Sequence, residues 1–134
     1  MKIETSELIG AALDWAVAEC EGYDINIRTE LSTPYIQANY VKDYHYPEGV
    51  FATYYPSTNW AQGGPIIERY VVQVERGIDS YWAYTNKYYW MEKDGGTDYR
   101  SESTKEGGSY LEAAMRCYVA SKLGDEVDIP EELL

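Results

Sequence analysis

Segments that favour helices lie at the two ends of this chain, and segments that favour strands lie between them. Residues 6–20 place apolar side chains at helical spacing, with Thr5 or Ser6 as a cap and Gly22 as a stop. Residues 110–123 repeat this pattern and end at Gly124. Helices and strands that are separated along the chain are typical of α+β proteins. We therefore predict an antiparallel sheet of about five strands, with the N-terminal and the C-terminal helix packed on one face.

Each helix is expected to bury one apolar face. On the first helix this face comprises Ile9, Ala12, Leu13, Ala16, Val17 and Cys20, with Leu8 and Trp15 at its margins. On the second helix it comprises Leu111, Ala114, Met115, Tyr118 and Val119. Arg116 is expected to point away from this face and to form a surface ion pair with Glu112, one turn earlier.

Strands are expected in the middle of the chain, where residues with strand propensity alternate with turn residues. The expected strands are residues 25–28, 51–55 and 66–75, a less regular one near residues 35–41, and a hairpin made by residues 80–84 and 88–93. The polar stretch from residue 97 to residue 108 is expected to be mobile.

The length of 134 residues is typical of a single domain, residues 1–134, and residues 125–134 form an acidic tail. No apolar run is long enough to span a bilayer, and the first residues lack the layout of a signal peptide. We therefore expect a cytoplasmic protein without membrane contact. Cys20 and Cys117 are expected to be reduced, buried thiols. Because His45 is the only histidine and there is no Cys-x-x-Cys pattern, zinc sites of the familiar spacing are excluded.

The charge and the tyrosine content limit the classes of partner. A formal charge of −12 argues against nucleic-acid binding, which needs a basic surface. The chain holds 15 tyrosines and one phenylalanine. Tyrosine combines an apolar ring with a hydrogen-bonding hydroxyl, so it suits surfaces that are shared with a ligand or a partner, but it also favours strands. The sequence leaves both explanations of the tyrosine excess open.

The stretch from Tyr55 to Glu68 has the composition of a binding loop. Trp60 offers a large flat ring, and the amides of Asn59 and Gln62 offer donors and acceptors beside it. The pair of glycines that follows allows the backbone to approach a ligand closely. Tryptophan is also often buried, so Trp60 is either a ligand platform or an ordinary core residue.

Three parts of the sequence are informative together: Thr5-Ser6-Glu7-Leu8 with Ala12-Leu13-Asp14-Trp15-Ala16-Val17-Ala18, then Pro56-Ser57-Thr58-Asn59-Trp60-Ala61-Gln62-Gly63-Gly64-Pro65-Ile66-Ile67, and then Ala113-Ala114-Met115-Arg116-Cys117-Tyr118-Val119-Ala120-Ser121-Lys122-Leu123-Gly124-Asp125-Glu126-Val127. They resemble the NinX-like family of small tailed-phage and prophage proteins. The resemblance implies a phage setting and no particular activity. Asn59 stands where the family's loop is expected to carry an acid, which argues against a carboxylate role there.

Catalysis lacks support in the sequence. A Ser-His-Asp triad or a Cys-His dyad would have to use His45, and nothing in the sequence places either cysteine beside it. No phosphate-binding P-loop occurs, because Pro65 follows the two glycines and no Gly-Lys-Ser/Thr is present. We therefore expect a protein that is not an enzyme and that uses no cofactor and no metal.

The favoured hypothesis is a phage accessory protein that binds and sequesters a nucleotide-derived host immune signal, such as a cyclic oligonucleotide or an ADP-ribose derivative. The phage setting enters only by analogy, because some small phage proteins act in this way. Stacking of one base on an aromatic ring contributes about 1–3 kcal/mol. Tyr54, Tyr55, Trp82 or Trp90 would join Trp60 as platforms, glycine amides would meet phosphate, and arginines would supply positive charge. The predicted ligand-binding residues are Tyr55, Ser57, Asn59, Trp60, Gln62, Gly63, Gly64, Arg69, Trp82 and Arg116.

A phage inhibitor that binds a host protein is the alternative. The tyrosine-rich surface resembles an interface, and the charge of −12 could steer the protein to a basic partner. Trp15 lies away from the centre of the first helix's apolar face, and together with the tyrosine excess it suggests self-association. We predict a homodimer or a larger homo-oligomer.

Overall fold

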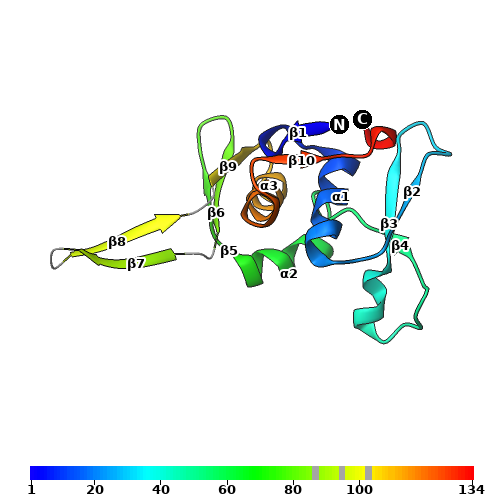
Figure 1. The fold of residues 1–134 in the computed structure, drawn as a ribbon, viewed down its shortest axis with the longest axis horizontal. Coiled ribbons are helices and arrows are strands. Elements are labelled where there is room, and N and C mark those ends of the chain that lie inside the picture. The colour runs from blue at the N-terminus through cyan, green and yellow to red at the C-terminus, as the bar shows by residue number, and fades with distance from the viewer. Residues whose placement is uncertain (86–87, 94–95, 102–103) are drawn as a thin grey trace.

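The computed structural model describes residues 1–85, 88–93, 96–101 and 104–134. In these residues three α-helices form the centre: α1 (Gly10–Glu21), α2 (Trp60–Tyr70) and α3 (Tyr110–Leu123). Figure 1 shows α3 between α1 and the strands β5, β6 and β9, with α2 packed below it. Short 3₁₀ helices occur at η1 (Thr5–Glu7), η2 (Asn39–Tyr44) and η3 (Glu131–Leu133). No helix of the described residues is long and apolar enough to cross a membrane.

The strands form small sheets in which every described pairing is antiparallel. One three-stranded sheet contains β2 (Ile25–Arg28), β3 (Tyr35–Ala38) and β4 (Ala52–Thr53). The other contains β5 (Val71–Arg76), β6 (Tyr81–Thr85) and β9 (Thr104–Gly107). The pair β7 (Tyr88–Lys93) and β8 (Gly96–Ser101) extends away from the helices in Figure 1. The pair β1 (Lys2–Glu4) and β10 (Glu126–Asp128) joins the two ends of the chain.

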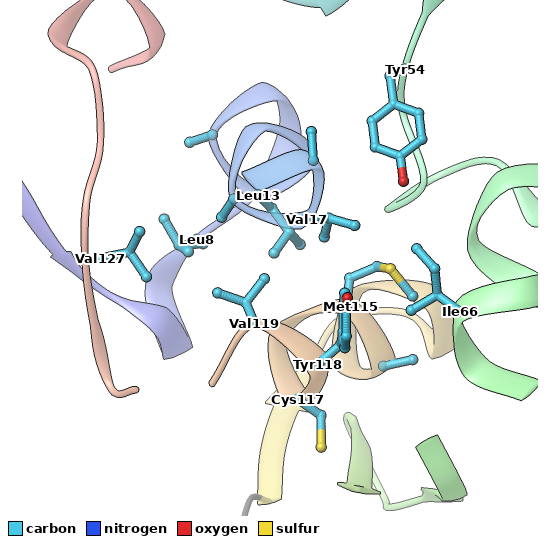
Figure 2. Close-up of a cluster of buried hydrophobic side chains, with 14 of the residues drawn as sticks. Leu8, Leu13, Val17, Tyr54, Ile66, Met115, Cys117, Tyr118, Val119 and Val127 are labelled. Atoms are coloured by element: carbon cyan, nitrogen blue, oxygen red, sulfur yellow. The ribbon is translucent and has the colours of Figure 1, made fainter. Parts of the chain in front are cut away.

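The core lies between α1 and α3 and continues to α2. Figure 2 shows Leu13 and Val17 of α1 facing Val119 of α3, while Met115 reaches Ile66 of α2. All five side chains are buried. Because this contact brings α2 onto α3, it also brings the beginnings of these two helices close together, and the candidate site lies there.

The α+β class is confirmed, and so are several elements. α3 and β2 have the predicted bounds, and α1 ends at Gly22 in the left-handed conformation, with a φ of 75°. The two cysteines do not form a disulfide; Cys117 is buried as predicted, whereas Cys20 is only half-buried. Desolvation raises the pKa of the Cys20 thiol to about 12, which keeps it protonated and unreactive.

The first helix begins later than predicted. Residues 5–7 form η1, Ile9 is extended, and α1 begins at Gly10. The interruption rotates the chain, so Leu8 is buried while Ile9, assigned to the core face, is exposed. A helical spacing of apolar residues does not reveal such a break when the residues on both sides of it still reach the core.

The strand pairing differs from the prediction in two places. Residues 66–70 belong to α2, so the strand predicted over residues 66–75 is shortened to β5. Residues 81–85 pair with β5 and β9, and residues 88–93 pair with β8, so these two segments do not form the predicted hairpin with each other. The stretch predicted to be mobile contains most of β8 and β9 instead. The described strands form several small sheets, and the five-stranded sheet is not found.

Candidate functional site

A tight turn over residues 55–59 leads the chain into α2. The amides of Thr58 and Asn59 both donate to the carbonyl oxygen of Tyr55, at 3.1 and 3.0 Å. The side-chain oxygen of Asn59 then accepts a hydrogen bond from the backbone amide of Gln62 at 3.2 Å and caps α2. The segment predicted as a loop is therefore a cap followed by a helix. A helix with Pro65 in its interior is hard to predict, because proline usually ends helices.

Gly63 allows α2 to approach the preceding turn and α3. A Cβ atom at this position would lie 2.5 Å from the carbonyl oxygen of Pro56 and 2.8 Å from Cδ2 of Leu111. The Gly63 amide donates to the carbonyl oxygen of Asn59 at 2.8 Å. Gly64 follows inside the helix, where amides bond to carbonyl groups four residues earlier. The backbone amides of both glycines therefore belong to the hydrogen bonding of α2 and are not presented to a ligand.

A buried carboxylate on α1 holds the turn by a hydrogen bond. Asp14 of α1 is only 5% exposed, and its Oδ1 accepts a hydrogen bond from the Ser57 amide at 2.9 Å. Burial raises the pKa of Asp14 to about 6, although its contacts with Ser57 act in the opposite direction. The Ser57 hydroxyl lies near this carboxyl group but meets no partner in hydrogen-bonding geometry within the described residues. The turn therefore depends on a titratable group that lies inside the protein.

The beginnings of α2 and α3 border a shallow hollow of about 270 Å³, which we call the aromatic groove. It is lined by Ser57, Thr58, Trp60, Ser109, Tyr110 and Leu111. Trp60 is 57% exposed, and its ring centroid lies 5.1 Å from that of Tyr110 at an interplanar angle of 40°. Trp60 is thus a surface residue and not an ordinary core residue.

A second hollow of about 300 Å³ lies on another side of α2, and we call it the tyrosine cleft. It is lined by Glu21, Tyr23, Tyr40, Tyr44, Tyr54, Gln62, Pro65, Ile66 and Arg69. The ring of Tyr54 contacts those of Tyr40 and Tyr23, with centroids 5.0 and 5.6 Å apart. These rings pack on one another, so they form a continuous wall.

The polar groups of the tyrosine cleft are bonded to one another. Gln62 donates to the Tyr40 hydroxyl at 2.9 Å and to the Thr53 carbonyl at 3.2 Å, and its Oε1 accepts from the Tyr55 amide at 2.7 Å. Arg69 donates to Glu21 at 2.6 Å. A charged ligand in this cleft would have to compete with the ion pair. The cleft therefore fits a ligand less well than the aromatic groove does.

Replacing Gln62 with leucine should destabilise the protein by about 1–2 kcal/mol, because it removes the hydrogen bonds to Tyr40, Thr53 and Tyr55 that tie α2 to the preceding segments. Urea denaturation monitored by circular dichroism measures this loss. Leucine at Gln37, which is half-buried on β3 and has no side-chain hydrogen bond to these groups, serves as a comparison. Equal stability of the Gln62→Leu variant and the wild type would mean that water replaces these bonds without cost.

The structure brings only some of the predicted site residues together. Ser57 and Trp60 line the aromatic groove, whereas Gln62 and Arg69 line the tyrosine cleft. Trp82 lies beside Gly77, outside both hollows, and it is 41% exposed.

Tyr55 and Arg116 line neither hollow. Tyr55 is partly exposed at the start of the turn. Arg116 was expected on the surface, but it is buried, and its Nε donates to the Leu8 carbonyl at 2.8 Å. The predicted pair with Glu112 is present, at 3.2 Å. Arg116 points inward because the break between η1 and α1 leaves the Leu8 carbonyl facing α3.

Four of the residues that line the aromatic groove, Thr58, Ser109, Tyr110 and Leu111, and the supporting Asp14 were not among those predicted. Tyr110 and Ser109 lie at the start of α3, far from Trp60 in sequence, and only the packing of α2 on α3 brings them to it. Asp14 supports the turn from α1. The sequence feature that could have indicated a buried carboxylate is the position of Asp14 between Leu13 and Trp15, next to the apolar face of a helix. In the described residues no group of three or more His, Cys, Asp or Glu side chains could hold a metal ion.

The fold and the site define a small α+β protein in which the beginnings of two helices meet beside the exposed Trp60, whose ring contacts the half-buried Tyr110. The family model described as Bacteriophage P22, NinX matches residues 4–122, and the chain belongs to this phage protein family. The resemblance found in the sequence is thereby confirmed. A comparison with curated proteins finds none that matches.

Proposed function

We propose that this phage protein binds a nucleotide-derived immune signal of the host in the aromatic groove and sequesters it without catalysis. The ligand class is a cyclic oligonucleotide or an ADP-ribose derivative. One observation carries the proposal: the exposed ring of Trp60 lies beside Tyr110 at the point where α2 and α3 begin. A flat ring next to helix beginnings suits a ligand with a base and a phosphate.

The aromatic ring would hold the base. Trp60 and Tyr110 are already in contact, so a base would stack on the free face of Trp60 and not between the two rings. One such stack contributes about 1–3 kcal/mol, which alone gives only weak binding. The remaining affinity would come from polar contacts, for which Thr58 and Ser109 supply hydroxyl groups at the same groove.

The lining of the groove supports binding without turnover. None of its six residues is His, Cys, Asp, Glu or Lys, the side chains that most often act as general acids or bases. The hydroxyl groups of Thr58 and Ser109 lack a neighbouring base in this set that would activate them as nucleophiles. The Ser57 hydroxyl lies near the Asp14 carboxyl group, but it is buried and so is not presented to a ligand. A ligand held here would be released unchanged.

Replacing Trp60 with alanine should weaken ligand binding about 10- to 100-fold and leave the fold intact, because the side chain is exposed and forms a stacking platform. Native mass spectrometry with a panel of cyclic dinucleotides, cyclic trinucleotides and ADP-ribose derivatives identifies the ligand, and titration calorimetry then compares the variants. Trp82→Ala is the matched control, since Trp82 is partly exposed but lies outside the groove. Undiminished binding by the Trp60→Ala variant would remove the groove from the proposal.

Self-association is part of the proposal, because the groove is shallow and a second copy could cover a bound ligand. Light scattering at micromolar concentration, with and without ligand, measures the oligomeric state. A monomer in both conditions would contradict this part and leave the ligand site unaffected.

A phage inhibitor of a host protein is the second candidate. It is favoured by the exposure of Tyr44, Tyr46 and Tyr55 in a strongly acidic protein, which suits a basic partner. If the whole ligand panel leaves no adduct, affinity purification from host lysate with a Tyr44→Ser, Tyr46→Ser comparison tests this candidate directly.

A further inference from the structure

The tyrosine cleft has the aromatic lining of a cation site. The rings of Tyr23, Tyr40 and Tyr54 line it, and their planes meet at angles of 57°, 83° and 40° in the three pairs. Rings that meet at such angles form a corner instead of a parallel stack. Because the faces of aromatic rings are negative, boxes of tilted rings hold organic cations by cation–π interactions. The lining therefore favours a positively charged ligand.

Glu21 adds a negative charge to this lining. Its side chain is only 8% exposed, and it is the last residue of α1, the end at which a helix dipole is negative. Burial is the main reason that the pKa of the Tyr54 hydroxyl is raised, and Tyr23 and the negative charge of Glu21 act in the same direction. The field of Glu21 thus reaches the aromatic wall. An anion is repelled at this position, and a cation is attracted to it.

Arg69 shows how a cation is held beside this carboxylate. Its Nη2 donates to Oε1 of Glu21 at 2.6 Å, and its guanidinium carbon lies 5.2 Å from the ring centroid of Tyr70. The Arg69 side chain is 51% exposed, so water can solvate its charge when the pair opens. Glu21 is the buried partner, and a buried carboxylate needs a cation beside it. A second cation that enters the cleft can therefore replace Arg69 without leaving a buried charge unpaired.

We infer that the tyrosine cleft is a second binding site, which takes a primary alkylammonium group in exchange for Arg69 at Glu21. The inference goes beyond the proposed function, because the cleft shares no lining residue with the aromatic groove. The ammonium group donates to the Glu21 carboxylate, which can accept about four hydrogen bonds and accepts from Arg69 and Tyr118 in this structure. The alkyl chain lies against the tyrosine rings. A free diamine and a lysine side chain of a partner protein both carry such a group.

The test compares ligands that share an alkyl chain and differ in charge. Titration calorimetry of the full chain and of its Arg69→Gln variant, at pH 7.5 and low salt, would measure 1,5-diaminopentane, Nα-acetyl-lysine amide and 1-pentanol. We expect both ammonium compounds to bind, and the neutral alcohol, whose chain is as long as that of the diamine, not to bind. The tighter of the two ammonium compounds identifies the source, a free diamine or a lysine side chain. If neither binds to either protein, the inference is overturned and the proposed function is unaffected.

Two variants of the ion pair test the exchange, because they act in opposite directions. Arg69→Gln releases the carboxylate and should tighten diamine binding about five- to tenfold, whereas Glu21→Gln should weaken it at least about tenfold. Each has a control with the same change of net charge. Arg28→Gln opens the exposed pair between Arg28 and Glu30, and Glu131→Gln alters an exposed acid on η3. Both controls should bind the diamine as the wild type does, since a general attraction of cations to an acidic protein would change equally in control and test.

The Arg69→Gln variant decides the inference even if Glu21→Gln does not fold. Unchanged or weaker diamine binding by Arg69→Gln, shown to be folded by circular dichroism, overturns the inference, and so does unchanged binding by a folded Glu21→Gln variant. The aromatic lining has its own test. Tyr44 lines the cleft and Tyr46 does not, although the two side chains are similarly exposed. Tyr44→Leu should weaken diamine binding about threefold relative to Tyr46→Leu, and equal affinities of these two variants would overturn the role of the rings.

Discussion

Replacing Gly63 with alanine should lower the free energy of unfolding by about 3 kcal/mol. The added methyl group would lie 2.5 Å from the Pro56 carbonyl oxygen and 2.8 Å from Leu111. The leucine can move, but Pro56 is held by the turn at the start of α2, so the helix itself has to shift. Overpacking of this kind typically costs about 1–3 kcal/mol, and backbone contact places Gly63 at the upper end.

The neighbouring glycine supplies the control. A Cβ atom at Gly64 meets no atom within 4 Å, and alanine favours the interior of a helix by about 0.5–1 kcal/mol over glycine. Gly64→Ala should therefore stabilise the protein. Urea denaturation of the two variants, which differ by one position, measures both effects. If the two changes destabilise equally, close packing at Gly63 is not what holds α2 in place.

Replacing Asp14 with asparagine should remove a strong pH dependence of stability. The pKa of Asp14 rises from its ordinary value of 3.8 to about 6 in the folded protein, chiefly because the group is buried. Between these two values the folded protein holds a proton that the unfolded chain has lost. The free energy of unfolding therefore falls as the pH rises through this window, by about 3 kcal/mol for a shift of this size. Asparagine has no such proton and can still accept from the Ser57 amide.

The measurement is urea denaturation of both proteins at several pH values from 4 to 7.5. The wild type should lose about 3 kcal/mol relative to the Asp14→Asn variant across this range, with most of the change below pH 6. Asp79→Asn, which alters an exposed acid, should follow the wild type. Parallel curves for the wild type and the Asp14→Asn variant would show that the carboxylate is solvated in solution.

The sequence predicted those helices and strands whose own residues form a clear local pattern. α3 combines an apolar face with a glycine directly after its last turn, and β2 is a short alternating segment, so both bounds were predictable. α2 was missed because two glycines and a proline lie within it, and each disfavours a helix when considered alone. Packing against α3 overrides that preference, and no local pattern reports such packing.

The site was predictable only where one segment supplies it. Trp60 and Ser57 come from the turn and the beginning of α2, and both were predicted from its composition. Tyr110 and Asp14 reach the same place from α3 and α1, over long distances in sequence. The pairing of β6 with β9 was missed for the same reason, because β9 lies in a stretch whose composition is polar. Long-range packing, which the sequence does not display, determined both outcomes.

The position of α3 late in the chain has a consequence for synthesis. This helix contacts α1, α2, β5, β6 and β9, all of which precede it. While a ribosome is still making residues 1–109, the apolar faces of those elements have no central helix to cover them. The nascent chain is therefore expected to stay open and exposed to chaperones and proteases until residues 110–123 emerge, and then to fold in one step.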